Sequence, residues 1–575
     1  MKRLFYIIAS FVAFSATQIS CSSLLDEVNY GNPTIEEMMT SEENVILLVG
    51  QIYADLKFTH DHWGYWGLTT ITGDEAICIP RNGGQHWNDG GYWLKQNTHI
   101  WDHRGDAIKN VWNITISGAV LCNQVIETLN TYKSSMTEEI YAQYVGEVEV
   151  MRSYYFYLLF DFFGRIPYTE KYEEATGPLL EPQEVWSNLV AVLERNAPNM
   201  AVVNDANRAM NYGRTTQGFA YALLARLYLN AESYGCTPDN VFKTVDAPEQ
   251  YKGSFYDNCL RCCNAVIDAG SYGIEANYFD NFKIFNEDSK ENIFVIVENG
   301  MEKDERDNGA GGTAVKNKLR IVHVTHHYGI QFYYGMLLDT WNGFCARPAF
   351  LDLYASTDVR GPGNERKGTG NTKQWGWFLG PVHKAGSTDA LYVDINNDEE
   401  TDIRPEITSI TSGHNFDGAR LNKWEIDKTG TYKYCENDFP LFRYADVLWM
   451  KEEAIARGAA GASGVQTDDF KTMLKRSFAY DANPEAAFEA AYGNVSSWSL
   501  DKILDERGRE FTWEMVRRRD LIRFDKFNSI QYVTDAKAKE AVRKWFPIPH
   551  SVLEKSLLDE NGNKIWTQTP GYEKL

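Results

Sequence analysis

Positive charge is scarce in this 575-residue chain. It has 57 lysines and arginines against 79 aspartates and glutamates, which gives a formal net charge of −22. Binding to nucleic acid needs a basic face that neutralises phosphates, and electrostatic binding to anionic lipid needs the same. The charge balance therefore argues against a nucleic-acid-binding protein and against a protein held on a membrane by charge.

Signature motifs of common enzyme classes are also missing. The sequence contains no P-loop, no nucleophile elbow, no HExxH zinc motif and no glycine motif for a dinucleotide. The glycine-rich stretch 308–312 is not followed by Lys-Ser or Lys-Thr, so we interpret it as a loop. Nothing in these motifs predicts phosphate transfer or metal-dependent proteolysis.

Cysteine is sparse, with nine residues scattered along the chain. Cys259, Cys262 and Cys263 lie on a helical pattern, but a CxxC metal site needs a second pair of matching spacing, and there is none. We expect the eight cysteines after Cys21 to be core residues or free thiols instead of a disulfide framework.

Residues 1–20 have the form of a signal peptide. Lys2 and Arg3 precede an apolar run over 4–16 that is too short to span a bilayer. The run leads to Ser20-Cys21, which resembles a bacterial lipobox in which Cys21 becomes the lipidated N-terminus, although Gln18 stands where an apolar residue is commoner. Plain secretion with Cys21 as a thiol is the alternative. Residues 21–40 are expected to form a tether.

Helical periodicity covers most of the chain. Apolar residues recur three and four positions apart, and Thr137 and Gly164 mark the ends of the clearest segment. The segments are expected to pack as helix–loop–helix units of a tetratricopeptide-like superhelix, with a generic helical bundle as the alternative. Helices are predicted over 42–58, 107–132, 137–163, 181–196, 215–234, 255–269, 444–457, 467–479 and 500–523.

Two long regions break the helical pattern. Residues 59–106 are rich in Gly, Asn, Asp, His and Trp, and residues 271–440 contain short β-like runs such as 293–297 between Gly/Asn turns. Such long stretches in a folded protein are usually functional or form a subdomain. The predicted organisation is a helical region over 41–270 with a loop at 59–106, an irregular subdomain over 271–440, and a C-terminal helical repeat and closing segment over 441–575.

Five segments, in chain order, resemble elements of the SusD/RagB family of outer-membrane nutrient-binding lipoproteins of Bacteroidetes. The resemblance extends from Cys21 to Tyr572. The five segments are 149–167 with Arg152, Tyr155 and Gly164-Arg-Ile-Pro167; 218–228; 439–448 with Arg443-Tyr-Ala-Asp446; 503–511 with the following Arg518-Arg-Asp-Leu521; and Phe546-Pro-Ile-Pro549.

The resemblance implies a mostly α, SusD-like fold. Four tetratricopeptide-like helix pairs would form a scaffold, and an irregular, loop-rich subdomain with short β-strands would be carried on it. In this sequence the pairs would be 41–58 with 107–132, 137–163 with 181–197, 214–234 with 255–270, and 440–458 with 499–524.

The resemblance also implies a function. Such a protein would bind an oligo- or polysaccharide at the cell surface and deliver it to a SusC-like TonB-dependent transporter of the outer membrane, without catalysis and without a cofactor. The lipid on Cys21 would hold it at the outer membrane. A peptide-capturing, RagB-like lipoprotein is the alternative, although the density of tryptophan favours a glycan.

Sugar binding needs aromatic faces that stack on the C–H face of a pyranose, and short polar side chains for its hydroxyls. Five of the 16 tryptophans fall within 63–101 among such polar residues, and a second aromatic patch precedes the segment 347–360, which resembles a family element. Some of these tryptophans are expected to pack against the scaffold. The candidate ligand-binding residues are Trp63, Trp66, Arg81, Asn82, Trp87, Asn88, Asp89, Trp93, Trp101, Tyr333, Tyr334, Trp341, Asn342, Trp375 and Trp377.

Acidic residues and histidines suggest other chemistry only weakly. Glu506 and Glu510 share a helix face, as an acid/base pair could, but the arginines between them favour a neutralised structural cluster. A glycosidase would need two opposed carboxylates in a cleft, and Asp74 and Glu75 are adjacent and point different ways. Arg443 is expected to pair with Asp446 on one helix face. The histidines of 60–103 have no convincing carboxylate partners, so no metal site is predicted. The run 394–402 resembles a calcium loop without the glycine and final glutamate of an EF-hand, which leaves a structural Ca²⁺ as an alternative.

Overall fold

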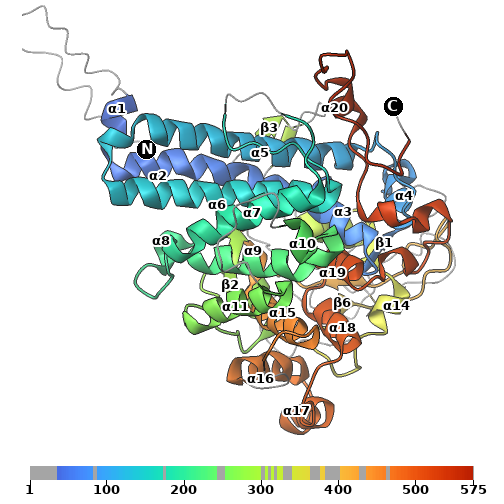
Figure 1. The fold of residues 1–575 in the computed structure, drawn as a ribbon. Helices are drawn as coiled ribbons and strands as arrows, with labels where there is room; N and C mark the ends of the chain where they lie inside the picture. Colours follow the sequence, from blue (N-terminus) through green and yellow to red (C-terminus); the bar gives the residue numbers. More distant parts are fainter. Residues whose placement is uncertain are drawn as a thin grey trace, which may run out of the picture.

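Helices form most of the structure (Figure 1). The computed structural model describes residues 35–81, 87–172, 177–241, 253–298, 305–307, 313–315, 320–327, 340–362, 376–381, 402–426, 436–461 and 467–573. The helices that build the scaffold are α2 (Glu42–Gly50), which continues into the 3-10 helix η1 (Gln51–Phe58), α5 (Asp106–Thr131), α6 (Glu138–Phe163), α7 (Pro182–Asn196), α9 (Gln217–Asn230), α11 (Phe255–Asp268), α15 (Tyr444–Ala456), α18 (Leu500–Glu510) and α19 (Arg517–Arg523).

The N-terminal helices lie side by side as a layer (Figure 1). η1 packs against α5, α5 against α6, and α6 against α7. Gly118 of α5 faces Tyr155 of α6 so closely that a Cβ at this position would lie 2.4 Å from the tyrosine ring. The small residue therefore lets the two longest helices approach each other. α6 begins where predicted, because the Thr137 hydroxyl accepts a hydrogen bond from the Ile140 N–H, and it ends before Gly164.

The remaining helices complete the predicted pairing. α9 packs against α11, α15 packs against α11 and α18, and α19 follows α18 after a short turn. Each of the four expected pairs is therefore present, and the SusD-like fold class is confirmed. The single helix predicted over 500–523 is wrong, because the chain leaves the helix after Glu510, adopts a left-handed backbone at Trp513 and Met515, and starts α19 at Arg517. The other described helix ends differ from the predicted ends by only a few residues.

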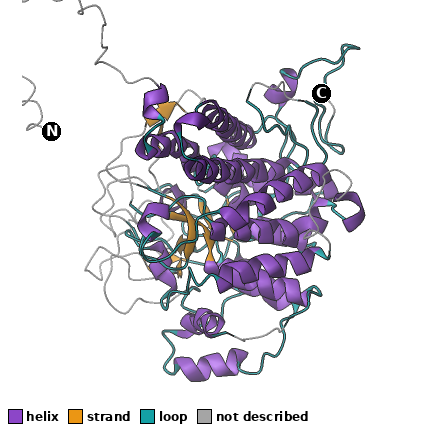
Figure 2. Ribbon diagram, turned by 60° about the vertical axis from the view of Figure 1, so that its left-hand side comes forward, coloured by secondary structure: helices purple, strands orange, loops and turns teal. Residues whose placement is uncertain are grey.

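Short antiparallel strand pairs lie among loops beside the helical layer (Figure 2). β2 (Asn292–Ile296) realises the predicted 293–297 run and pairs with β10 (Phe439–Arg443). β6 (Gly376–Phe378) pairs with β9 (Arg420–Asn422). β1 (Ala76–Cys78) pairs with β5 (Phe344–Ala346), so that Cys78 lies opposite Phe344. This last pair joins two segments that are more than 250 residues apart in sequence.

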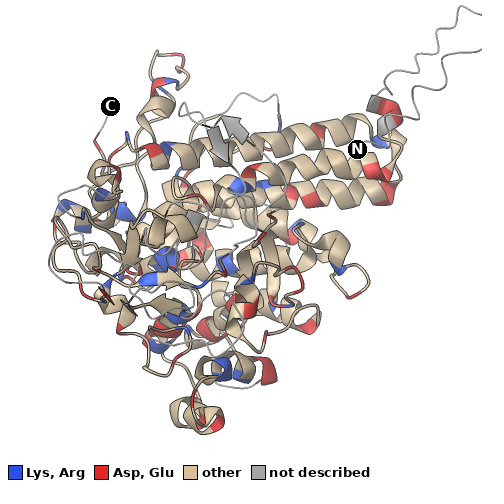
Figure 3. Cartoon of the chain, turned by 180° about the vertical axis from the view of Figure 1, so that it is seen from behind, with Lys and Arg blue, Asp and Glu red and all other residues tan. Residues whose placement is uncertain are grey.

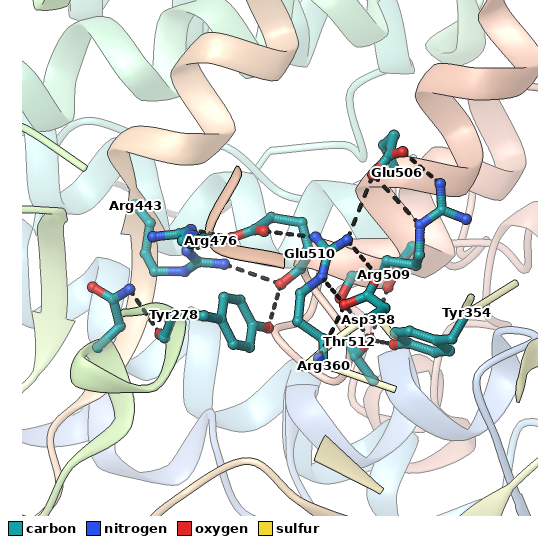
Figure 4. A network of polar contacts seen from close by, with 12 residues as sticks. Tyr278, Tyr354, Asp358, Arg360, Arg443, Arg476, Glu506, Arg509, Glu510 and Thr512 are labelled. Atoms are coloured by element: carbon teal, nitrogen blue, oxygen red, sulfur yellow. Dashed lines mark hydrogen bonds and ion pairs between the residues drawn. The ribbon is translucent and has the colours of Figure 1, made fainter. Parts of the chain in front are cut away.

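A buried ion-pair network fixes the irregular region to the C-terminal helices (Figure 4). Glu510 of α18 accepts from Arg443 at 2.9 Å, from Arg476 at 2.7 Å and from Arg360 at 3.0 Å. These side chains are almost fully buried, and the three guanidinium groups hold the pKa of Glu510 well below its ordinary value despite the burial. The predicted neutralised cluster is confirmed.

The expected pair between Arg443 and Asp446 is wrong. Arg443 ends strand β10 and points to Glu291, Glu510 and Glu514. Asp446 lies on α15 and pairs with two other arginines, Arg226 at 2.7 Å and Arg507 at 2.8 Å. The three-residue spacing did not bring the two side chains together because Arg443 precedes the helix in an extended conformation.

Glu506, the other half of the suggested carboxylate pair, is also neutralised. It accepts from Arg509 at 2.6 Å and lies 3.6 Å from Arg360. Both carboxylates therefore hold the subdomain in place and are covered by protein (Figure 4).

The cysteines are structural. Cys78, Cys122, Cys236 and Cys345 and the three on α11 are buried free thiols, as predicted, and Cys435 lies outside the described residues. Among the described helices, none is long and apolar enough to cross a membrane. Acidic residues gather at the end of the helical layer nearest the N-terminus, on α1 (Ile35–Met38), α2 and the first turn of α6 (Figure 3).

Candidate ligand-binding site

The β1–β5 pair brings the two predicted aromatic patches together. The segment before β1 contains α3 (Tyr65–Thr72), and the segment after it leads to α4 (Tyr92–Asn97). Trp341, Asn342 and Gly343 directly precede β5. Since the two strands are hydrogen-bonded in register, the loop at 59–106 and the patch at 341–344 lie against each other.

Four tryptophan rings surround His62 at this place, and Tyr92 packs against two of them, Trp63 and Trp93. We call this group the aromatic cluster. It consists of His62, Trp63, Trp87, Tyr92, Trp93 and Trp341. The His62 ring centroid lies 5.3 Å from that of Trp341, 5.5 Å from Trp87, 5.8 Å from Trp63 and 6.0 Å from Trp93. Trp87 and Trp341 are 5.3 Å apart with planes inclined by 40°, and Trp63 lies 5.1 Å from Tyr92.

Exposure separates the cluster from the other tryptophans. Within the described residues, every tryptophan is buried except Trp63, Trp87, Trp341 and Trp566. Three of these four partly exposed indoles belong to the aromatic cluster. His62, at 6% exposure, and Trp93, which is fully buried, form its base. The cluster therefore presents indole surface to solvent on a supported platform.

Two carboxylates border the aromatic cluster. Asp61 accepts from the Trp63 backbone N–H at 2.8 Å, and its Oδ1 lies 2.9 Å from His62 Nδ1. Asp89 accepts from the Trp93 indole N–H at 2.6 Å. Partial burial raises the pKa of Asp89, and hydrogen bonds from the Trp93 and Trp87 side chains oppose that rise. Both carboxylates therefore hold cluster residues in position.

Hydrogen bonds hold the loop that carries Trp341 against the residues beneath it. The backbone N–H groups of Trp341, Asn342 and Gly343 donate to carbonyls of the segment 323–326. Arg81, fully buried, donates to the Asn342 carbonyl at 2.9 Å, and Arg420 donates to the Asn342 side chain at 2.6 Å. A rigid support of this kind orients the exposed rings above it.

Gly343 allows Trp87 to reach the loop. A Cβ at Gly343 would lie 2.4 Å from two ring carbons of Trp87, which is closer than any side chain tolerates. The indole of Trp87 thus packs directly on the backbone. The sequence prediction missed Gly343, His62 and Tyr92, because a glycine and two common loop residues carry no signal before the contact partner is known.

Several predicted ligand residues lie in the core instead. Their side chains are covered by protein, so they are not available at the surface to contact a ligand. The Trp66 indole donates to the Trp513 carbonyl at 2.9 Å, and that of Trp101 donates to the Tyr572 hydroxyl at 2.9 Å. The buried residues among the candidates are Trp66, Arg81, Asn88, Trp93, Trp101, Asn342 and Trp377.

Asn88 has a local role, since its side chain accepts from the Gly91 N–H at 2.8 Å and caps the short helix η3 (Asp89–Gly91). The candidates that remain at the surface are Trp63, Trp87, Asp89 and Trp341. Asn82, Tyr333, Tyr334 and Trp375 lie outside the described residues. So does most of the calcium-like run 394–402. In the described ranges, no group of three or more His, Cys, Asp or Glu is arranged to hold a metal ion.

Two family models match the chain. One is described as starch-binding associating with outer membrane and matches residues 74–229, and the other, the SusD family, matches residues 291–572. This chain belongs to the SusD/RagB family. The aromatic cluster joins the two matched regions of this SusD/RagB protein, since Trp87 comes from the first and Trp341 from the second.

Known members of the SusD/RagB family are similar along most of the chain. The starch-binding protein SusD of Bacteroides thetaiotaomicron is 23% identical over 451 residues, which is 74% of this chain and 72% of SusD. Surface glycan-binding protein A of the same species, solved in complex with laminarihexaose, superposes with a TM-score of 0.61 at 21% identity and covers 89% of this chain and 97% of its own. The Bacteroides fluxus protein of that name has a TM-score of 0.64 at 19% identity, with coverage of 92% and 100%. These structures establish the fold of the present SusD/RagB protein.

Proposed function

We propose that this SusD/RagB protein binds a glycan at the aromatic cluster. The observation that carries the proposal is that three of the four partly exposed tryptophans in the described chain gather there. These indoles pack against the core and still keep part of their ring surface accessible, and the C–H face of a pyranose needs flat apolar surfaces of this kind.

The expected strength follows from the area covered. Stacking one sugar on one indole removes on the order of 50–100 Å² of apolar surface from water, which contributes roughly 1–2.5 kcal/mol at about 25 cal/mol per Å². Two indoles used together would thus account for a micromolar to millimolar site, once the cost of immobilising the ligand is included. Asp89 lies beside the rings and is placed to accept hydrogen bonds from sugar hydroxyls.

Delivery and anchoring complete the proposal. The protein acts at the outer surface of the outer membrane, held by lipid on Cys21, and passes its glycan to a SusC-like TonB-dependent transporter. It performs no catalysis itself. Family membership and the lipobox resemblance support this assignment, and the burial of Glu506 and Glu510 in ion pairs removes the carboxylate pair that a glycosidase would have used.

Peptide capture is the less favoured alternative. Peptides are recognised mainly through backbone hydrogen bonds and separate side-chain pockets. The aromatic cluster instead offers adjoining indole faces with inclined planes. A peptide bound through its backbone by strand addition would make no use of the three adjoining, partly exposed indoles.

Affinity electrophoresis tests the proposal. The purified protein, which is acidic enough to migrate in a native gel, is run through gels that contain different polysaccharides or mucins. One glycan class is expected to retard it, and Trp87→Ala and Trp341→Ala are each expected to weaken that retardation by about 5- to 50-fold.

The matched control is Trp566→Ala, because among the described residues Trp566 is the partly exposed tryptophan that lies outside the aromatic cluster. This variant should migrate like the parent. Equal losses in all three variants would point to a general loss of structure, and retardation that survives in both cluster variants would place the glycan elsewhere and refute the proposed site.

A further inference from the structure

The polar border of the aromatic cluster is negative. The Asp61 side chain is 23% exposed, and the Asp89 side chain is partly exposed. Both aspartates lie within two or three residues of cluster members in the sequence. Their hydrogen bonds run to Trp63 and Trp93, so the two carboxylates are fixed beside the exposed indoles. Any ligand on those indoles lies within the field of both carboxylates.

Two guanidinium groups of the described chain, those of Arg81 and Arg420, contact the loop that carries Trp341 and face inward. Arg81 has no exposed surface, and besides the Asn342 carbonyl it donates to the carbonyls of His414 and Asp417, both at 2.8 Å. Arg420 is equally buried and donates to the Asp417 carbonyl at 2.7 Å. Both cations are committed to main-chain oxygens below the loop, so neither is placed to pair with a carboxylate or sulfate of a ligand.

Two chain segments that adjoin the cluster in sequence add neither lysine nor arginine. Residues 82–86 read Asn-Gly-Gly-Gln-His, and residues 328–339 contain Asp339 and neither lysine nor arginine. The exposed base nearest along the described chain is Lys95 on α4, three residues after Tyr92. The single charge of one flexible, strongly hydrated ammonium does not neutralise the charge of two carboxylates that are fixed beside the rings.

We infer that the aromatic cluster selects uncharged glycans and rejects anionic ones such as uronate-, sulfate- or sialate-bearing polysaccharides. The inference rests on the proposed function and adds the class of substrate. Asp89 is the residue that sets the selectivity, because its carboxylate accepts hydroxyl hydrogen bonds from a neutral sugar and repels an anionic one. A carboxylate or sulfate is bound through charge-assisted hydrogen bonds from cationic side chains, and the two described arginines that contact the Asn342 loop are buried and donate to main-chain oxygens and the Asn342 side chain.

Matched pairs of ligands test the selectivity. The probes are an α-glucan, a β-glucan, a mannan and a galactan, each compared with the same polymer after its primary alcohols are oxidised to carboxylates. Titration calorimetry at low salt measures the affinity of each pair. The neutral member of a bound pair is expected to bind at least about fivefold more tightly, and the difference should shrink at about 0.5 M salt because the repulsion is screened.

Asp89→Asn removes the charge at constant size and is expected to reduce the difference in affinity between a neutral polymer and its oxidised counterpart. Glu127→Gln, an exposed acid on α5 away from the cluster, is the matched control and should leave the difference unchanged. If Asp89→Asn loses its structure, the salt dependence of the parent still decides the question.

If an oxidised polymer binds as tightly as its neutral counterpart or more tightly, and Trp87→Ala abolishes that binding, the inferred selectivity is overturned and the proposed function stays intact. A difference between paired polymers that does not shrink with salt would also overturn it. Binding of none of the polymers, neutral or oxidised, would overturn the proposed function together with this inference.

Discussion

Replacing Gly343 by alanine is expected to disable the ligand site while sparing the scaffold. The new methyl group would lie 2.4 Å from Trp87 Cε3 and Cζ3 and 2.9 Å from the Val324 carbonyl oxygen. Since real Cβ contacts are not shorter than about 3.0 Å, the indole has to move by at least about 0.6 Å. The backbone at Val324 accepts a hydrogen bond from Gly343 and has little freedom, so the ring moves.

The magnitude follows from the contacts that this movement disturbs. Trp87 packs at 5.3 Å from Trp341 and at 5.5 Å from His62, and each such aromatic pair contributes about 0.5–1.5 kcal/mol. Overpacking adds a stability cost of about 1–3 kcal/mol. Glycan affinity is expected to fall by about 5- to 50-fold, because one stacking face leaves its position.

The assay is titration with the glycan found by electrophoresis, combined with denaturant unfolding. Gly50→Ala is the control, since a Cβ at Gly50 meets nothing within 4 Å and the position ends a helix. The double variant Gly343→Ala/Trp87→Ala should bind no more weakly than Trp87→Ala alone, because both changes act through one ring. Parental affinity in Gly343→Ala, or full additivity in the double variant, would refute the reasoning.

Three further predictions concern the scaffold. Glu510→Gln is expected to cost about 3–5 kcal/mol of unfolding free energy, because three buried arginines lose a charged partner. The stability deficit of this variant should shrink as the pH falls below the ordinary carboxyl range, since a group with a lowered pKa contributes its full stability above that range and loses it as the pH falls toward its own lower pKa. An equal deficit at acidic pH would contradict this account. Glu75 is buried beside the Trp513 N–H, and burial raises its pKa to about 8. Between pH 5 and 9 the unfolding free energy of the parent should therefore fall by on the order of 3–5 kcal/mol relative to that of Glu75→Gln. Parallel curves of unfolding free energy against pH would contradict that prediction. Thiol alkylation of the folded protein should be slow at all seven described cysteines and fast in denaturant, which mass spectrometry would show; rapid labelling of Cys122 in the folded state would contradict the burial.

Local signals made the scaffold predictable. The ends of α6 follow from Thr137, whose hydroxyl caps the helix, and from Gly164, after which the chain leaves it. The helix pairs also follow from apolar periodicity and from elements that resemble those of the SusD/RagB family. The partners of Arg443 could not be predicted in this way, because Glu291 and Glu510 reach it from distant parts of the chain.

The candidate site was predictable in composition and not in geometry. Trp63 and Trp66 are three residues apart in the region 59–106, which the sequence predicts as a loop, whereas the structure places Trp66 on α3. Only the packing of α3 against Trp513 decides that Trp66 is covered and Trp63 is not. The meeting of Trp87 with Trp341 depends on the β1–β5 register, which joins strands far apart in sequence and leaves no local pattern. Long-range contacts of this kind are the part that a single sequence does not reveal.

The most direct measurement of the central claim is a crystal structure of the protein with the glycan that retards it. The account predicts density for sugar rings lying against the exposed faces of Trp87 and Trp341, with a hydroxyl within hydrogen-bonding distance of the Asp89 carboxylate. Sugar density at another surface, with the aromatic cluster empty at full occupancy of the ligand, would contradict it.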